Sequence, residues 1–301
     1  MTPDFTLDIV SPQFPCGAAW LANAMLELNV PLHELWGFAT AREWTHGPHG
    51  QSVYSAVELP WRQTLASLKL GRLFEFRNHI RPRFSHAYPW QIEPCAQVVW
   101  MVRDPRDALF SEWRRQLHNG GLPASTEFME FLQTPFDGGP ISNVDMLWLH
   151  LRAWMAVMEQ AANQVYLLRF EDWKLDPVDS LRRVCEWAEI QTEPDGLQRA
   201  ANASDVQHLL AIEKSLRDAD PSARQFNRAG ISEEWRSTWD ASWLCAMGAH
   251  WQPVLAKLGY APLPAPSTNV PTFCLEEVLV WRGLGPSAQF DQWRDLLLNR
   301  E

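Results

Sequence analysis

The sequence predicts an α/β protein with three layers, in which helices cover both faces of a central parallel sheet. Apolar runs at residues 97–102 and 164–170 are typical of parallel strands buried on both faces. Each run passes directly into a segment with helical periodicity, and strands that alternate with helices pair into parallel sheets. With 301 residues, 46% of them hydrophobic, the chain can bury one large core.

The other elements follow from the same signals. In chain order we expect a strand at 5–11, a turn with Gly17, a helix at 18–28, loops with short elements at 31–60, a strand at 81–86, a helix at 145–160, a helix opened by Asp176 and Pro177, mainly helical chain beyond Pro194, a Pro-rich connector at 262–271, an apolar segment at 273–281 and a short helix at 289–299. We therefore predict an α/β domain of residues 1–262. Residues 263–301 would form a connector and helical tail that packs on the domain or on a partner subunit, for example in a homodimer.

The strand at 97–102 leads into strong helix-start signals. Asp104 is suited to the N-cap, Pro105 to the first helical position, and Asp107 is an acid in the first turn. Arg103 would thus lie at the carboxyl end of a central strand, the edge at which open α/β sheets bind ligands. A surface ion pair of Arg103 with one of the two aspartates is the alternative.

Composition excludes several classes of protein. The formal net charge of −10 argues against general nucleic-acid binding. No run of 18 apolar residues and no secretory signal pattern appears, so we expect no membrane partner and a cytoplasmic location. The cysteines lack CxxC spacing and nearby histidines, which argues against disulfides and metal sites; they are Cys16, Cys95, Cys185, Cys245 and Cys274.

Two further segments have ligand-binding character. The turn around Gly17 enters a helix and would present backbone N–H groups to a phosphate, as a P-loop-like strand–turn–helix site does, although the GxxxxGK[ST] pattern is absent. Arg228 and Gly230 lie in a loop before a helix, where an arginine can bind phosphate and a glycine allows close backbone approach. Each of these features is common in proteins, so neither alone identifies a phosphate site.

Together these segments resemble the sulfotransferases that use 3′-phosphoadenosine 5′-phosphosulfate (PAPS). The family's Arg-Asp/Asn-Pro-Arg/Lys-Asp segment, with a serine eight residues after the first arginine, is intact as "RDPRDALFS" at 103–111. "RFEDWKLDP" at 169–177 and "RAG....WR" at 228–236 are similar to two other family segments. The amino-terminal family loop is matched by "FPCGAAW" only at Gly17 and Trp20. The resemblance covers about residues 8 to 260.

The resemblance implies PAPS as the co-substrate, 3′-phosphoadenosine 5′-phosphate (PAP) as the product, and no metal. Arg103, Ser111 and Arg228 would hold the 3′-phosphate, the backbone around Gly17 would hold the 5′-phosphosulfate, and Trp20 would stack near the adenine. The full set of cofactor-binding residues implied is Cys16, Gly17, Ala18, Ala19, Trp20, Arg103, Ser111, Phe170, Arg228, Ala229 and Gly230.

The resemblance also assigns the catalytic base to His86, which follows a predicted strand upstream of Arg103. A hydrogen-bonded structural histidine is the alternative. The two lysines of the family fall at Pro15 and Phe84 here. We expect a nearby arginine to supply the missing charge and assign this catalytic role to Arg83; Arg77 and Arg81 are the other candidates.

The predicted function is a cytoplasmic, PAPS-dependent sulfotransferase. It would move a sulfuryl group to a hydroxyl or amine of a small-molecule acceptor, which we expect to be a specialised metabolite. The missing lysines leave open an inactive relative that binds PAP or a partner. A P-loop-like kinase is disfavoured, because the loop lysine is absent.

Overall fold

The structure is a computed structural model that describes residues 7–30, 34–35, 38–39, 44–46, 52–54, 73–74, 80, 82–93, 96–219, 227–228, 230–263, 273–284 and 288–298. The strands are β1 (Leu7–Val10), β2 (Glu34–Leu35), β3 (Phe38–Ala39), β4 (Trp44–His46), β5 (Ser52–Tyr54), β6 (Leu73–Phe74), β7 (Arg83–Ser85), β8 (Gln97–Val102) and β9 (Val165–Arg169). The helices are α1 (Ala18–Glu27), α3 (Pro105–His118), α4 (Phe128–Gln133), α5 (Asn143–Gln160), α6 (Phe170–Leu175), α7 (Pro177–Trp187), α8 (Gly196–Ala203), α9 (Val206–Ala219), α10 (Trp235–Thr238), α11 (Ala241–Ala246), α12 (Trp251–Lys257), α13 (Leu275–Trp281) and α14 (Ala288–Leu298), with 3-10 turns η3 (Pro89–Gln91) and η4 (Phe136–Gly138).

The main sheet has the strand order β3-β2-β7-β1-β8-β9. Strands β2, β7, β1, β8 and β9 run parallel, so the predicted central parallel sheet is confirmed. β3 adds an antiparallel edge strand that the sequence did not predict. A second, antiparallel sheet has the order β4-β5-β6, and its first two strands fall within the stretch expected to hold short elements.

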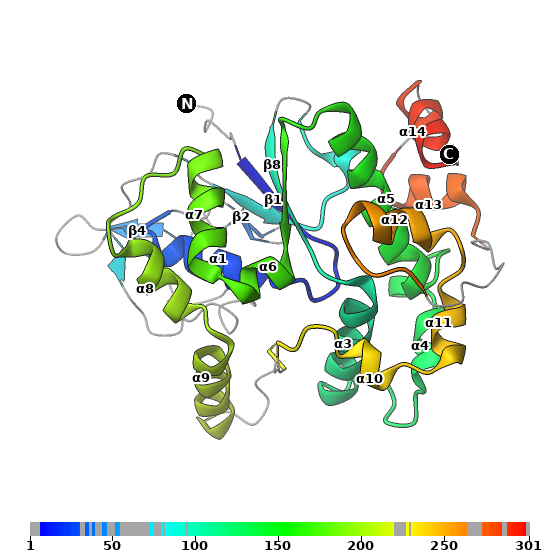
Figure 1. Cartoon of the computed structure of the whole chain (residues 1–301), viewed down its shortest axis with the longest axis horizontal. Helices are drawn as coiled ribbons and strands as arrows, with labels where there is room; N and C mark the ends of the chain where they lie inside the picture. Colours follow the sequence, from blue (N-terminus) through cyan, green and yellow to red (C-terminus); the bar gives the residue numbers. More distant parts are fainter. Residues whose placement is uncertain are drawn as a thin grey trace.

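Helices cover both faces of the main sheet, as predicted (Figure 1). Val98, Trp100 and Val102 of β8 pack in one hydrophobic cluster with α3, α4 and α5. Val99 and Met101 pack in a second cluster with α1 and α7. Because alternate side chains of a strand point to opposite faces, β8 is buried on both sides. This explains its uninterrupted apolar sequence and establishes the three layers.

The segment after β8 folds as its sequence predicts. α3 begins at Pro105, and the Asp104 side chain caps it by accepting a hydrogen bond from the Arg106 backbone N–H at 3.0 Å. β8 has the predicted bounds. β9 ends one residue earlier than expected because Phe170 begins α6, which has two acidic residues in its first turn. Negative charge there stabilises a helix N-terminus.

The C-terminal helices pack on the rest of the same chain. Leu275, Val278 and Leu297 are buried in the cluster that contains α5. The ring of Trp293 on α14 lies 5.2 Å from that of Trp90 in η3, centroid to centroid. α14 lies beside α5 in Figure 1. The domain boundary at residue 262 stays a prediction, since residues 264–272 lie outside the described ranges.

Four parallel strands end at the same edge of the main sheet, and the residues that follow them meet there. Ser11 follows β1, His86 follows β7, Arg103 follows β8 and Phe170 follows β9. The carboxyl edge of a parallel sheet is the general ligand-binding edge of α/β folds. The topology therefore gathers residues that are far apart in the sequence.

Candidate active site

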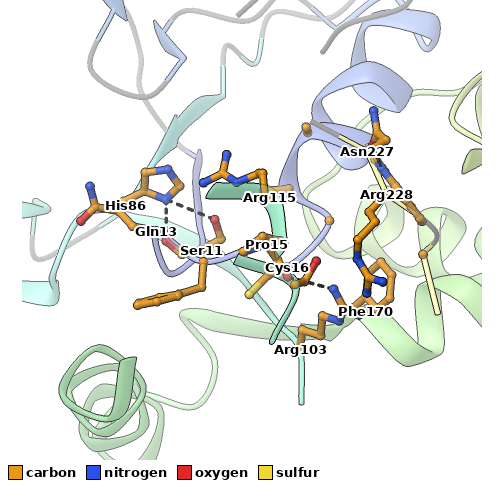
Figure 2. Close-up of a pocket in the computed structure, with 17 residues that line it drawn as sticks. Ser11, Gln13, Pro15, Cys16, His86, Arg103, Arg115, Phe170, Asn227 and Arg228 are labelled. Atoms are coloured by element: carbon orange, nitrogen blue, oxygen red, sulfur yellow. Dashed lines mark hydrogen bonds between the residues drawn. The ribbon is translucent and has the colours of Figure 1, made fainter. Parts of the chain in front are cut away.

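A cavity of about 430 Å³ opens at this edge, within the size range of small-ligand sites (Figure 2). Among its described lining residues three are arginines and none is acidic, so the cavity suits an anion. The lining includes every predicted cofactor-binding residue except Ala229, which lies outside the described residues. The lining residues are Ser11, Gln13, Phe14, Pro15, Cys16, Gly17, Ala18, Ala19, Trp20, His86, Arg103, Ser111, Arg115, Phe170, Asn227, Arg228 and Gly230.

The turn before α1 requires a glycine. Gly17 has φ +85°, and a Cβ at this position would lie 2.7 Å from Phe170 Cδ2 and 2.9 Å from Met101 Cε. The first turn of α1 contains no acidic residue and has no side-chain cap. Backbone N–H groups at such a helix start are available to an anion. Burial raises the pKa of the neighbouring Cys16 thiol to about 12, so that side chain adds no negative charge.

Arg103 is the buried cation of the cavity, with only 5% of its surface exposed. Its guanidinium donates to the carbonyl oxygens of Pro15 at 3.4 Å and Ile231 at 2.7 Å, and lies 4.7 Å from the centre of the Phe170 ring. In the described part of the chain no carboxylate pairs with it, and its Nε has no partner. The Asp107 carboxylate interacts with Arg103 through its charge but does not contact it, so a bound anion would stabilise this buried cation further. The surface ion pair considered from the sequence is therefore wrong.

The two aspartates after Arg103 have other partners. Asp104 binds the buried Arg106 through both carboxylate oxygens, at 2.8 and 2.7 Å. Asp107 accepts the backbone N–H groups of Glu233 at 2.6 Å and Trp235 at 2.9 Å. Burial raises the pKa of Asp107 to about 6. Asp107 thus connects α3 to the loop that carries Arg228 and Gly230.

That loop brings a second arginine to the cavity. Arg228 is partly buried and pairs with Glu234, one contact being 2.9 Å long. Gly230 has φ +57°, and a Cβ there would lie 2.7 Å from the Trp20 ring. Ser111 reaches the same cavity from α3. The cavity end with Arg103, Ser111 and Arg228 therefore offers two guanidinium groups and a hydroxyl to a phosphate.

A hydrogen-bond network that the sequence did not predict holds Trp20. The indole Nε1–H donates to Asn227 Oδ1 at 2.6 Å, and Asn227 Nδ2 donates to the buried Glu213 at 2.7 Å. The Trp20 ring packs 5.2 Å from that of Phe170. An aromatic platform fixed in this way suits a planar base. No local sequence signal marks Asn227, because its partners are distant in the chain.

His86 lies at the opposite end of the cavity, next to Ser11. Its Nδ1 is 3.0 Å from the Ser11 carbonyl oxygen, and a carbonyl only accepts, so Nδ1 carries the proton. In the neutral ring the lone pair is then on Nε2. Burial, together with the charges of Arg115 and Arg282, lowers the pKa of His86 to about 4. His86 is therefore neutral at pH 7 and can accept a proton.

Comparison with known proteins decides the family. A family model described as a sulfotransferase domain matches residues 60–259, about two thirds of the chain. The chain belongs to the sulfotransferase family. The matched region contains His86, Arg103 and Arg228 but not the Gly17 turn, in agreement with the weak resemblance of that turn to the family loop.

Individual relatives of this chain are distant. Rat Sulfotransferase 2A1 is 28% identical over 114 residues, which are 37% of this chain and 38% of the rat protein. Human Sulfotransferase 1C2 is 20% identical over 204 residues, 65% of this chain and 62% of the human protein. The alignments thus span less than two thirds of these relatives.

Solved structures confirm the fold. Mouse sulfotransferase SULT7A1, crystallised with PAP, has a TM-score of 0.51 and 16% identity, and the match covers 79% of each chain. Retinol dehydratase in complex with androsterone and PAP has a TM-score of 0.52 and 14% identity, with coverage of 89% of this chain and 83% of that chain. These values establish the sulfotransferase fold of the chain.

The structure places Arg83 away from the cavity. Its guanidinium binds the buried Asp8 through Nε at 2.7 Å and Nη2 at 2.8 Å. The two residues are paired in the register of β7 and β1, upstream of the carboxyl edge. The geometry therefore argues against the predicted catalytic role of Arg83. Arg77 and Arg81 lie outside the described residues.

Two arginines that the sequence reasoning did not select approach His86 instead. Arg115 of α3 lines the cavity. Arg282, at the end of α13, donates to Gln13 Oε1 at 2.7 Å and lies 5.2 Å from the centre of the Tyr88 ring. Both charges lower the pKa of His86. Arg115 could have been found as the residue one helical turn after Ser111, whereas nothing local marks Arg282.

Proposed function

We propose that this sulfotransferase-family protein transfers the sulfuryl group of PAPS to a hydroxyl or amine of a small-molecule acceptor. The observation that carries the proposal is a single cavity with anion-binding groups at one end and a neutral histidine at the other. The proposal rests on the family match together with this arrangement.

The donor would occupy the end with the arginines. Arg103, Ser111 and Arg228 would bind the 3′-phosphate, and Trp20 and Phe170 would contact the adenine. The backbone N–H groups around Gly17 would bind the 5′-phosphosulfate. The PAP ligands of the two solved structures support a nucleotide of this kind. Arg103 fits this role because it is buried and, in the described part of the chain, no carboxylate contacts its guanidinium.

The acceptor would approach from the His86 end. Nε2 would remove the proton of the acceptor hydroxyl or amine as its oxygen or nitrogen attacks sulfur. Holding donor, acceptor and base in one cavity converts the encounter into an oriented reaction. A cavity of about 430 Å³ supports a small acceptor, and we propose a specialised metabolite.

The proposed setting is the cytoplasm. None of the four described cysteines forms a disulfide, which supports a reducing compartment; they are Cys16, Cys185, Cys245 and Cys274. In the described ranges no helix is long and apolar enough to cross a bilayer, and no group of three or more potential ligand side chains could hold a metal. A homodimer and the absence of a nucleic-acid partner stay predictions.

Radiolabelled sulfuryl transfer tests the proposal. Purified protein would be incubated with ³⁵S-labelled PAPS and a panel of phenols, alcohols and amines, with His86→Asn as the control. Transfer of label by the wild type, with kcat reduced by roughly 10²–10⁴ in His86→Asn, is expected. Tight PAP binding without transfer to any acceptor would instead support the inactive relative, which Pro15 and Phe84 at the lysine positions favour.

A further inference from the structure

The positive charge at the His86 end of the cavity comes from a residue that the sequence did not suggest. The family lysines are replaced by Pro15 and Phe84, and Arg83 is bound to Asp8. Of the described arginines that line the cavity, Arg103 and Arg228 belong to the opposite end, and the third is Arg115.

Arg115 reaches the cavity from the same face of α3 as Ser111. The two residues are four positions apart, so they are neighbours on the helix surface. Figure 2 shows the Arg115 guanidinium turned toward the His86 ring, away from Arg103 and Arg228. From this position the Arg115 charge lowers the pKa of His86.

The side chain of Arg115 is oriented by Glu112. Nε and Nη2 contact Glu112 Oε2 at 2.8 and 2.6 Å, and Gln116 donates to the other carboxylate oxygen at 2.7 Å. The Arg115 side chain stays 31% exposed, whereas that of Glu112 is 6% exposed. Nη1 has no partner among the described residues. A buried carboxylate thus holds one edge of the guanidinium and leaves N–H donors for a ligand.

We propose that Arg115 is a catalytic residue of the sulfuryl transfer, binding the oxygens of the transferring group between Gly17 and His86. This rests on the proposed function. Arg115 would take over the charge that two lysines supply elsewhere in the family, from a different element of the fold.

The step balances without a further reactant. The bond between sulfur and the 5′-phosphate oxygen breaks, and its electron pair stays on the phosphate of PAP. The acceptor oxygen or nitrogen forms the new bond to sulfur, and its proton moves to Nε2 of His86. Arg115 remains protonated throughout and donates hydrogen bonds to the sulfuryl oxygens, whose charge it offsets in the transition state.

A purely structural role is the rival explanation, because Arg115 could serve only to neutralise the buried Glu112. The rival predicts that loss of Arg115 lowers stability and nucleotide binding together. The proposal predicts a loss of kcat with PAP binding preserved, because PAP lacks the sulfuryl group. Arg114 provides the matched control, since it is an exposed arginine on the same helix.

The experiment compares Arg115→Gln, Arg115→Lys and Arg114→Gln with the wild type. It measures kcat and KM with PAPS, Kd for PAP by calorimetry, and thermal stability. Arg115→Gln should lower kcat by about 10²–10³, the loss expected for one donor to a developing anion, and change Kd for PAP less than about threefold. Arg115→Lys should recover part of kcat, and Arg114→Gln should match the wild type.

The outcomes separate this inference from the proposed function. An active wild type whose kcat survives in Arg115→Gln overturns the role of Arg115 and leaves the proposed function intact. A loss of PAP affinity and stability in proportion to kcat assigns Arg115 to structure and likewise overturns the inference. A wild type that transfers no sulfuryl group refutes the proposed function and, with it, the inference.

Discussion

Replacing Gly17 by alanine is expected to destabilise the protein through two separate effects. The first is the left-handed backbone, since φ is +85° and an L-residue there costs about 1–2 kcal/mol. The second is a steric clash, because the new methyl group would lie 2.7 Å from Phe170 Cδ2 and 2.9 Å from Met101 Cε. Both neighbours are buried, at 2% and 0% exposure, so they cannot move into solvent.

Overpacking of a buried site costs about 1–3 kcal/mol, so the two effects together amount to about 2–5 kcal/mol. Gly120→Ala isolates the backbone effect, because Gly120 has φ +70° and nothing within 4 Å of the added Cβ. It should cost only about 1–2 kcal/mol. An unfolding entropy of about 2.1 cal/mol/K per residue gives about 0.6 kcal/mol/K for 301 residues. The expected decreases in Tm are then about 3–8 °C for Gly17→Ala and about 2–3 °C for Gly120→Ala.

Thermal unfolding of both variants, followed by calorimetric titration of PAP, measures these effects. Gly17→Ala should also bind PAP more weakly, because the methyl group displaces Phe170 and the turn that faces the phosphosulfate. Gly120→Ala should bind PAP like the wild type. Equal Tm values for the two variants, with equal PAP affinity, would refute the close packing of the Gly17 turn and its place in the donor site.

Four further predictions concern the site. Asp107→Asn should weaken PAP binding by about tenfold or more in calorimetry, because the loop with Arg228 loses a charged acceptor for two backbone N–H groups; unchanged affinity would show that the loop is held by other contacts. His86 should stay neutral at pH 6, because burial and the nearby arginine charges lower its pKa to about 4. The acid limb of kcat/KM should therefore lie well below pH 6.5. An NMR titration of the His86 ring should show the same low pKa. The same lowered pKa predicts that wild-type stability declines as pH falls from 6.5 through about 4, and that His86→Asn declines less; parallel declines would contradict it. Arg282→Gln should raise the pKa of His86 and shift the acid limb of kcat/KM upward, because it removes a nearby positive charge, whereas Arg294→Gln on α14 should leave the profile unchanged.

The strand–helix unit around Arg103 could be predicted from the sequence because its signals are local. An apolar run, an N-cap at Asp104 and a proline at the first helical position determine β8 and the start of α3 without information from elsewhere in the chain. The short helix predicted at 289–299 is also found, as α14 (Ala288–Leu298). The strand predicted at 164–170 is one residue too long at each end, and at its carboxyl end this is because Phe170 continues the apolar pattern although the chain has already turned into α6.

Contacts between distant segments could not be predicted. Arg83 was selected for its position near His86 in the sequence, but the register of β7 on β1 places it beside Asp8, where an ion pair holds it. Arg282 reaches Gln13 only because α13 packs back on the domain. Arg115 lies on the polar side of α3, as the helical pattern indicates, yet only the fold shows that this side faces His86. Each case depends on tertiary packing rather than on local propensity.

Binding of the 3′-phosphate tests the central claim most directly. Calorimetry would compare PAP with adenosine 5′-phosphate, which lacks the 3′-phosphate, on the wild type and on folded Arg103→Ala. Removing the 3′-phosphate should weaken binding to the wild type by about 10- to 100-fold, which is the loss of affinity expected for one charge-assisted hydrogen bond. The same change should have a much smaller effect on Arg103→Ala. Equal affinity of the wild type for the two nucleotides would contradict the assignment of Arg103 and the nucleotide site built on it.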